Sequence, residues 1–137
     1  NQENVLTIRK STIGFELDSK HGLLEWFLSQ SGDVQGYTNA IFNGMTTLEL
    51  AKKLIHIIEN QKELSGICHL TGEKIDKFTL LNKIKKVFKI NKVNVTPYPD
   101  YRCDRSLKGA EITKDFKYEI PSWDDMLEEL YNSSKKQ

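Results

Sequence analysis

Short apolar runs alternate with amphipathic helical segments along this chain, and that alternation limits its fold more than any single motif does. The run 5–9 is rich in β-branched residues, 66–70 is a short apolar run and 93–96 alternates, and all three have the length of strands. Between them, apolar residues recur every three or four positions, as on one face of a helix. Strands separated by helices indicate an α/β fold with an α+β-like character. The strands are few and short for a complete parallel sheet, so we expect part of a larger fold.

The most clearly marked helix begins at a capping box, Thr46-x-x-Glu49. In such a box the Thr hydroxyl accepts a free backbone N–H, and the Glu side chain reaches back to the cap. The helix is expected to end near Asn60. Its apolar stripe consists of Leu50, Leu54, Ile57 and Ile58, with Ala51 and Ile55 beside it.

Cap signals and apolar stripes predict further helices, about five in all. Asp18-Ser19 offers a cap before 21–30, and Asp76 offers one before a helix that buries Leu80, Leu81, Ile84, Val87 and Phe88. Ser122-x-x-Asp125 opens the last helix, with a stripe of Trp123, Met126, Leu127, Leu130 and Tyr131. A short helix is expected over 107–116, and the polar tail 132–137 is expected to fray.

The remaining segments are predicted to be strands and loops. Residues 5–9 should form a mostly buried strand, and 34–43 should be extended or irregular, with a turn at Asn43-Gly44. The strand at 93–96 should end at Pro97, because proline cannot donate to a ladder. We therefore expect 97–105 to be a loop.

Composition excludes several classes of protein. Apolar residues make up 38% and charged residues 28%, which is typical of a folded domain rather than a disordered tail. The net charge of +1 gives no general attraction to nucleic acid or to an anionic membrane. No apolar run approaches the roughly 20 residues that span a bilayer, and no signal peptide is expected. Two cysteines are too few for a disulfide scaffold, which favours a reduced, cytoplasmic protein.

The sequence offers little autonomous chemistry. The three histidines (His21, His56 and His69) lack the spacing of metal ligands, and Cys68 and Cys103 lie in no Cys-x-x-Cys motif. Neither a Gly-x-Gly-x-x-Gly loop nor a Walker loop is present. The lysines between 74 and 92 are interpreted as a solvated helix face, since no aromatic platform accompanies them. We predict neither a catalytic residue nor a metal site.

One segment, 98–106, is richer in functional groups. It contains two arginines (Arg102 and Arg105), two tyrosines and two aspartates. Arginine forks bind phosphate oxygens in bidentate fashion, and tyrosine can stack on a sugar or a base. An Arg–Asp network that pins the segment to the domain explains the same composition, so both interpretations stay open.

Three segments, in this order, resemble the C-terminal part of the dTDP-4-dehydrorhamnose reductases, members of the extended short-chain dehydrogenase/reductase family. The run 5–14 resembles the late Rossmann strand and the Arg-x-Ser-x-x-Gly turn after it. The run 39–51 resembles the loop that leads into a helix of type Thr-x-x-x-Leu-Ala. Residues 103–107 and 121–123 resemble the ending of the family, although Cys103 stands where many members have proline.

The resemblance implies two parts: 1–15 as the last strand and turn of a Rossmann domain, and 16–137 as a substrate-binding domain. Arg102, Arg105, Asn43 and Thr46 would then contact a nucleoside-diphosphate sugar. Ser11, Thr12 and Ile13 would lie near the nicotinamide end of NAD or NADP in the full-length enzyme. We expect the glycine-rich loop and the catalytic Tyr-x-x-x-Lys pair to be missing with the N-terminal Rossmann half.

The chain alone is therefore expected to bind no cofactor and to be inactive. Its first strand should pair with another copy, as in a homodimer, or be poorly ordered. The alternative is a non-catalytic binding or interaction module that reuses this fold. A dinucleotide loop and a Tyr-x-x-x-Lys pair upstream of residue 1 would favour the reductase, and their absence would favour the module. A trimmed or processed terminus explains the start of the chain as well as a fragment does.

Overall fold

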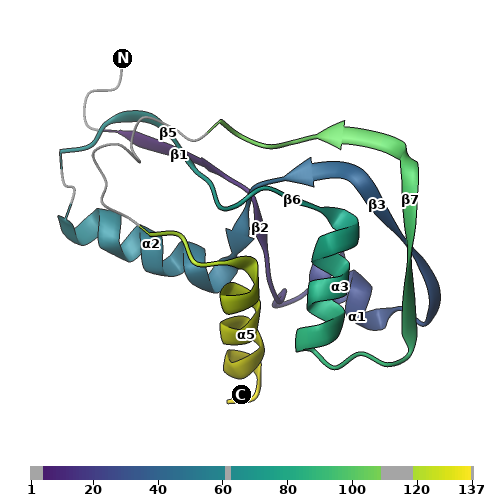
Figure 1. Cartoon of the computed structure of the whole chain (residues 1–137). Helices are drawn as coiled ribbons and strands as arrows, with labels where there is room; N and C mark the ends of the chain where they lie inside the picture. Colours follow the sequence, from purple (N-terminus) through teal and green to yellow (C-terminus); the bar gives the residue numbers. More distant parts are fainter. Residues whose placement is uncertain (1–4, 61–62, 109–118, 137) are drawn as a thin grey trace.

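A computed structural model describes residues 5–60, 63–108 and 119–136 of the chain. Strands and helices alternate, which confirms the predicted α/β class (Figure 1). The described residues contain four helices, against about five predicted, namely α1 (Leu23–Ser29), α2 (Thr47–Asn60), α3 (Lys77–Val87) and α5 (Trp123–Ser134). The helix expected over 107–116 falls largely outside the described residues. α5 extends into the tail that was expected to fray.

Two strands from distant parts of the chain form a parallel pair at one end of the molecule. β1 (Leu6–Lys10) and β5 (Gly66–Leu70) pair in register from Leu6 with Gly66 to Lys10 with Leu70. Both strands were predicted, but the expectation that the first is mostly buried is wrong, because none of its residues is fully buried. Its second edge has no partner strand among the described residues.

A second sheet, with the order β6-β3-β7, forms the other end of the molecule. It consists of β3 (Gly32–Phe42), β6 (Ile75–Asp76) and β7 (Val93–Asp104). β3 and β7 run parallel from Gly32 with Val93 to Ile41 with Asp104, with an irregularity between Tyr37 and Asn39. The extended segment 34–43 was thus correctly predicted, although the strand is longer.

The prediction of a loop over 97–105 is wrong, because β7 continues through Pro97 and Pro99 to Asp104. Proline removes one N–H donor from a ladder, and edge strands tolerate this loss because one side of the strand needs no partner. β7 is an edge strand in this sheet. The arginine-rich segment is therefore regular extended structure.

The helix caps follow the sequence signals in three cases. The Asp76 carboxylate accepts the Thr79 N–H at 2.8 Å, and the Ser122 hydroxyl accepts the Asp125 N–H at 3.2 Å. At the start of α2, the Thr46 hydroxyl accepts the Glu49 N–H at 3.3 Å. The expected cap of α1 is wrong, since Gly22 occupies that position without a side-chain bond.

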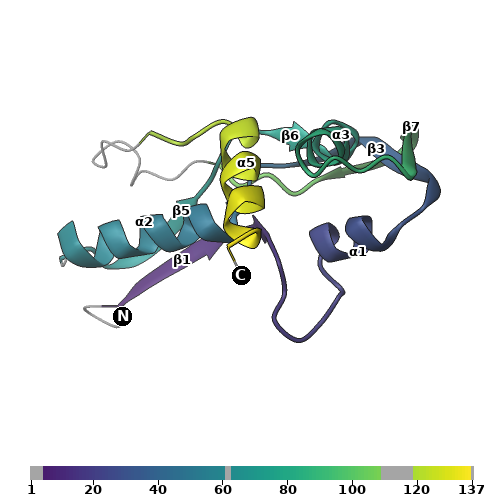
Figure 2. The same ribbon diagram turned by 90° about the horizontal axis from the view of Figure 1, so that it is seen from below.

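The core lies between the larger sheet and the helices α1, α3 and α5. Its fully buried members include Leu24, Phe27, Leu80, Ile84 and Trp123. The stripe of α2 is only partly buried: Ile57 is buried, but Ile58 is 70% exposed, contrary to prediction. Figure 2 shows α2, β1 and β5 at one end of the molecule, α1, α3 and β7 at the other, and α5 between them.

Candidate functional site

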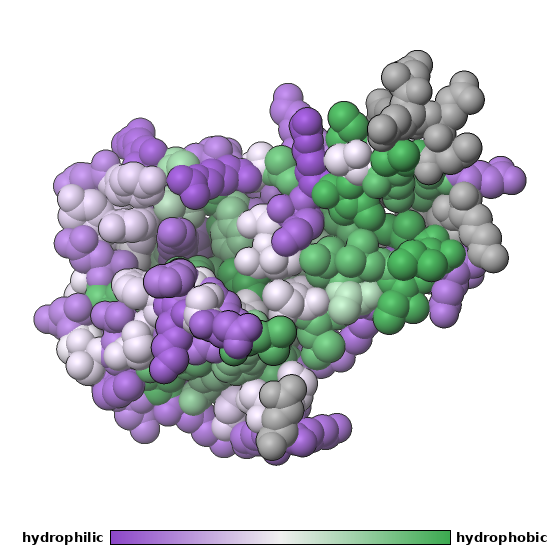
Figure 3. All heavy atoms as spheres, turned by 180° about the vertical axis from the view of Figure 1, so that it is seen from behind, coloured by the Kyte–Doolittle hydropathy of each residue, from purple (hydrophilic) through white to green (hydrophobic). Residues whose placement is uncertain are grey.

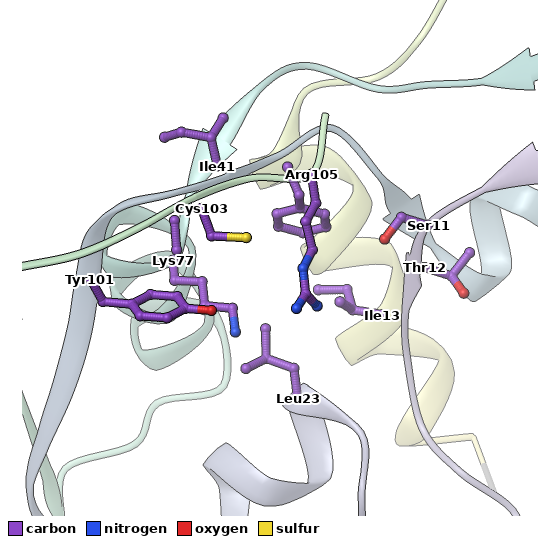
Figure 4. A pocket seen from close by; sticks show the side chains of 11 residues that line it. Ser11, Thr12, Ile13, Leu23, Ile41, Lys77, Tyr101, Cys103 and Arg105 are labelled. Carbon is purple, nitrogen blue, oxygen red and sulfur yellow. The ribbon is translucent and has the colours of Figure 1, made fainter. Parts of the chain in front are cut away.

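A cavity of about 210 Å³ opens where β2 (Thr12–Ile13) approaches β3 and β7 (Figure 4). Ser11, Thr12 and Ile13 line one side of it, and Arg105 reaches in from the other. The first three were predicted to lie near the cofactor, and Arg105 was predicted to contact the substrate. The fold thus brings two predicted groups, about 90 residues apart in the sequence, into one cavity.

The Ser11 side of the cavity is held by a close backbone crossing. β2 pairs in parallel with β4 (Met45–Thr46), and the Ser11 carbonyl accepts the Met45 N–H at 3.0 Å. A Cβ atom at Gly44 would lie only 2.3 Å from the Ser11 carbonyl oxygen. Glycine is therefore required at position 44, because any side chain would force the two segments apart.

The Arg105 side of the cavity is set by the alternation of β7. Successive side chains of a strand point to opposite faces. Tyr101, Cys103 and Arg105 line the cavity, whereas Arg102 and Asp104 do not. Beyond the end of β7, the Arg105 N–H still donates to the Ile41 carbonyl at 2.9 Å, which continues the ladder. The two predicted arginines are thus separated, and the phosphate contact of Arg102 stays a prediction.

The alternative interpretation, an Arg–Asp network, finds no support in the described residues. Among them, neither Arg102 nor Arg105 forms an ion pair with a carboxylate. The Asp104 carboxylate turns instead to Ser106 and accepts its N–H at 2.8 Å. The hydrogen bonds from the Ser106 side chain and backbone lower the pKa of Asp104.

Asn43 and Thr46, both predicted to contact substrate, are buried. The amide group of Asn43 donates to the Leu107 carbonyl at 2.6 Å and accepts the Leu107 N–H at 2.8 Å. The Thr46 side chain is fully buried and accepts a backbone N–H in the first turn of α2. These bonds fasten the chain after β7 and cap a helix. Substrate contact by either residue stays a prediction.

Lys77 is a charged lining residue that the sequence did not identify as part of a site. It was grouped with the solvated lysines of α3, yet it follows the N-cap Asp76 directly and lines the cavity. Its position directly after the N-cap, in the first turn of α3, is the sequence signal that distinguishes Lys77 from the other lysines of the helix. Among the described residues, Lys77 and Arg105 are the charged members of the cavity lining, and none of these lining residues is a carboxylate.

A second cavity, of about 470 Å³, lies on the other side of Lys77. It shares Leu23 and Lys77 with the first and is lined further by Trp26, Asp33 and Tyr37. The rings of Tyr37 and Tyr101, one from each cavity, have centroids 4.9 Å apart. The two spaces are therefore neighbours separated by a thin wall of side chains.

The two cysteines differ in environment. Cys103 lines the smaller cavity, whereas Cys68 is fully buried in β5, and burial raises the pKa of its thiol. Within the described part of the chain, no group of three His, Cys, Asp or Glu residues could hold a metal ion. None of the helices described is long and apolar enough to cross a membrane.

The expected absence of a Tyr-x-x-x-Lys spacing is wrong in one place. Tyr131 and Lys135 have this spacing near the end of α5. The Lys135 ammonium lies 4.3 Å from the Tyr131 ring centroid, and its hydrogen bond lowers the pKa of Tyr131. Tyr131 packs against Phe88, just beyond the last turn of α3, whereas Lys77 begins that helix. The pair does not line the cavity described above.

Comparison with known proteins identifies the architecture. No protein-family model matches the chain, and no curated protein matches it. Among solved structures, a dTDP-4-dehydrorhamnose reductase from Bacillus anthracis, in complex with NADP, superposes with a TM-score of 0.78 at 16% identity. The match covers 96% of this chain and 49% of that one.

Two further structures agree. The dTDP-4-dehydrorhamnose reductase from Yersinia enterocolitica matches with a TM-score of 0.71 at 16% identity, covering 93% of this chain and 49% of that one. The UDP-N-acetylglucosamine 4-epimerase from Methanobrevibacter ruminantium M1, in complex with UDP-N-acetylmuramic acid, matches with a TM-score of 0.65 at 16% identity. That match covers 95% of this chain and 46% of the epimerase.

This chain thus spans about half the length of the structures it matches. The resemblance inferred from the three sequence segments is confirmed at the level of the fold. The chain has the fold of about half of an extended short-chain dehydrogenase/reductase of the dTDP-4-dehydrorhamnose reductase type.

Proposed function

We propose that this chain is the substrate-binding portion of an NAD(P)-dependent nucleotide-sugar reductase and binds a nucleoside-diphosphate sugar in the cavity beside Arg105. The observation that carries the proposal is the cavity itself. Two cations, Lys77 and Arg105, line it, and no carboxylate of the described residues does, so the field of these residues favours an anionic ligand. Solved structures of the same fold include reductases and epimerases of nucleotide sugars, which supports this class of ligand.

The proposal includes a separate cofactor-binding half. Ser11, Thr12 and Ile13 fit the edge of a nicotinamide site, because they line the same cavity as the proposed substrate contact. NAD or NADP would supply the hydride there, while residues of this chain hold the sugar close to it. The described residues provide this edge only, so the rest of the dinucleotide site belongs to the other half.

The free edge of β1 is where we place that half. The strand pairs on one side with β5, and a two-stranded sheet is marginal by itself. Val5 and Ile67 are 44% and 63% exposed, and Figure 3 shows apolar side chains gathered over this end of the molecule. Further parallel strands beside β1 would cover this surface. The boundary at residue 15 stays a prediction, and β5 belongs to the same sheet as β1.

The cysteines provide a test of ligand binding that needs no activity. Cys103 lines the cavity and should react with iodoacetamide, whereas the buried Cys68 should react slowly and serve as an internal control. Saturating dTDP-glucose or UDP-N-acetylglucosamine should slow alkylation of Cys103, followed by mass spectrometry of its peptide. Free glucose is the control ligand. Unchanged alkylation, together with no heat of binding in calorimetry for either nucleotide sugar, would contradict the proposal.

A further inference from the structure

Lys77 occupies a position that no other cation of the described chain shares. It lines both cavities, at the wall between them, together with Leu23. In Figure 4 the Lys77 side chain extends into the smaller cavity beside Tyr101, and the Arg105 guanidinium enters the same space. Two positively charged groups therefore face one space from different elements, α3 and the end of β7.

The carboxylates that the structure describes near Lys77 have other partners; Asp33, which lines the larger cavity with Lys77, accepts the Asn94 amide at 2.9 Å. Among the described residues, Lys77 takes part in no ion pair. The adjacent carboxylate, Asp76, is occupied by Thr79, accepting its N–H at 2.8 Å and its hydroxyl at 2.7 Å. The charge at Lys77 is thus available to a ligand.

The Lys77 side chain is held by packing. Its Nζ lies 5.9 Å from the centroid of the Tyr37 ring, within the range of a cation–π contact. Tyr37 in turn stacks against Tyr101 across the wall. Because the Lys77 side chain is partly buried and its ammonium lies beside the Tyr37 ring, less side-chain freedom remains to be lost when a ligand binds.

We propose that Lys77 and Arg105 together bind the diphosphate group of the ligand at the boundary of the two cavities. An arginine fork can orient a phosphate by two parallel hydrogen bonds, and lysine adds a point charge. A diphosphate that joins two organic groups needs free space on both of its sides, and the two cavities provide it. This inference rests on the proposed function for the nature of those groups, but the diphosphate contact can be tested alone.

The test uses inorganic diphosphate as the probe and protection of Cys103 from iodoacetamide as the measurement. The variant Lys77→Met keeps the apolar stem and removes the charge, and Lys77→Arg restores a cation. Lys86→Met, an exposed lysine in the last turn of the same helix, is the matched control. Diphosphate should protect the native chain, Lys77→Arg and Lys86→Met at similar concentrations. Protection of Lys77→Met should require a diphosphate concentration at least about tenfold higher, as expected for the loss of one charge-assisted contact.

Each outcome separates this inference from the proposed function. Protection by diphosphate but not by nucleotide sugars would contradict the proposed function and support the diphosphate site. No protection of the native chain by diphosphate would overturn the diphosphate site. Equal protection of Lys77→Met and the native chain would overturn the assignment of Lys77. If Lys77→Met does not fold, as judged by circular dichroism, equal protection of Lys77→Gln and the native chain has the same meaning.

Discussion

The side-chain amide of Asn43 binds the backbone of Leu107 at both of its polar groups. Its nitrogen donates to the Leu107 carbonyl at 2.6 Å, and its oxygen accepts the Leu107 N–H at 2.8 Å. The two residues are 64 positions apart, and Asn43 is 6% exposed. This pair fixes the chain where it leaves β7, one residue after Ser106 and two after Arg105. The position of Arg105 in the cavity therefore depends on a residue outside it.

Removal of the Asn43 amide should destabilise the chain. Asn43→Ala leaves a backbone donor and an acceptor of Leu107 without their partner, which costs about 1–3 kcal/mol. Urea unfolding followed by circular dichroism measures the change in the free energy of unfolding. The control is Asn94→Ala, whose amide donates to Asp33 at 2.9 Å on the exposed surface, and its effect should stay within about 0.5 kcal/mol. Equal losses in both variants would contradict the assigned role of Asn43.

Local signals in the sequence predicted most of the helices and the paired strands β1 and β5. The caps at Asp76 and Ser122 depend on bonds within one turn, so they can be inferred from neighbouring residues alone. Pairing of β3 with β7 joins residues about 60 positions apart, and no local pattern encodes it. Because that pairing was not known, Pro97 was interpreted as the end of a strand. In the sheet it is a position within the edge strand β7.

The same limit affected the prediction of the site. With 97–105 interpreted as a loop, nothing distinguished Arg102 from Arg105. In a strand the side chains alternate, so one arginine faces the cavity and the other does not. Lys77 was missed because its neighbours on α3 are solvated lysines. Its place at the wall of two cavities depends on β3 and α1, which come from elsewhere in the chain.

The alternation of side chains along β7 predicts different roles for Arg102 and Arg105. Arg105→Ala should weaken binding of a nucleoside-diphosphate sugar about ten- to a hundredfold, since one charge-assisted contact contributes about 1.5–3 kcal/mol. Arg102→Ala, its matched control, should leave affinity nearly unchanged. Calorimetric titration of both variants measures the difference.

The melting temperature distinguishes a contact with substrate from a structural role. Arg105 has no ion pair among the described residues, so Arg105→Ala should melt within a few degrees of the native chain. A lowered melting temperature with unchanged affinity would instead support a structural role, and equal affinity losses in the two variants would contradict the alternation.

The contact between Tyr131 and Lys135 near the end of α5 predicts a pH-dependent ultraviolet signal. The hydrogen bond from Lys135, together with the charges of Lys135 and Lys89, lowers the pKa of Tyr131. In an ultraviolet titration Tyr131 should therefore ionise below the usual range of a phenol, and Tyr131→Phe should remove that step. Lys135→Gln should raise the pKa of Tyr131, whereas Lys136→Gln should change it less.

Because the pKa of Tyr131 is lowered, its contact with Lys135 affects the free energy of unfolding only in part of the pH range. A lowered folded-state pKa stabilises the fold above the unfolded pKa of about 10, and the contribution is lost as the pH falls through the folded pKa. The pair should therefore affect stability in the alkaline range. Lys135→Gln should therefore leave the free energy of unfolding at neutral pH almost unchanged, and a large loss there would contradict this account.

The purified 137-residue chain should transfer no hydride from NADH or NADPH to a nucleotide sugar. Hydride transfer requires a cofactor held against the substrate, and this chain spans about half of the structures whose fold it shares. Absorbance of the reduced nicotinamide, followed with dTDP- and UDP-linked 4-keto sugars, should not fall faster than in a blank without protein. A faster decrease that disappears in Arg105→Ala would show that the cavity completes a catalytic site within these residues. In that case the free edge of β1 would need another explanation than a cofactor-binding half.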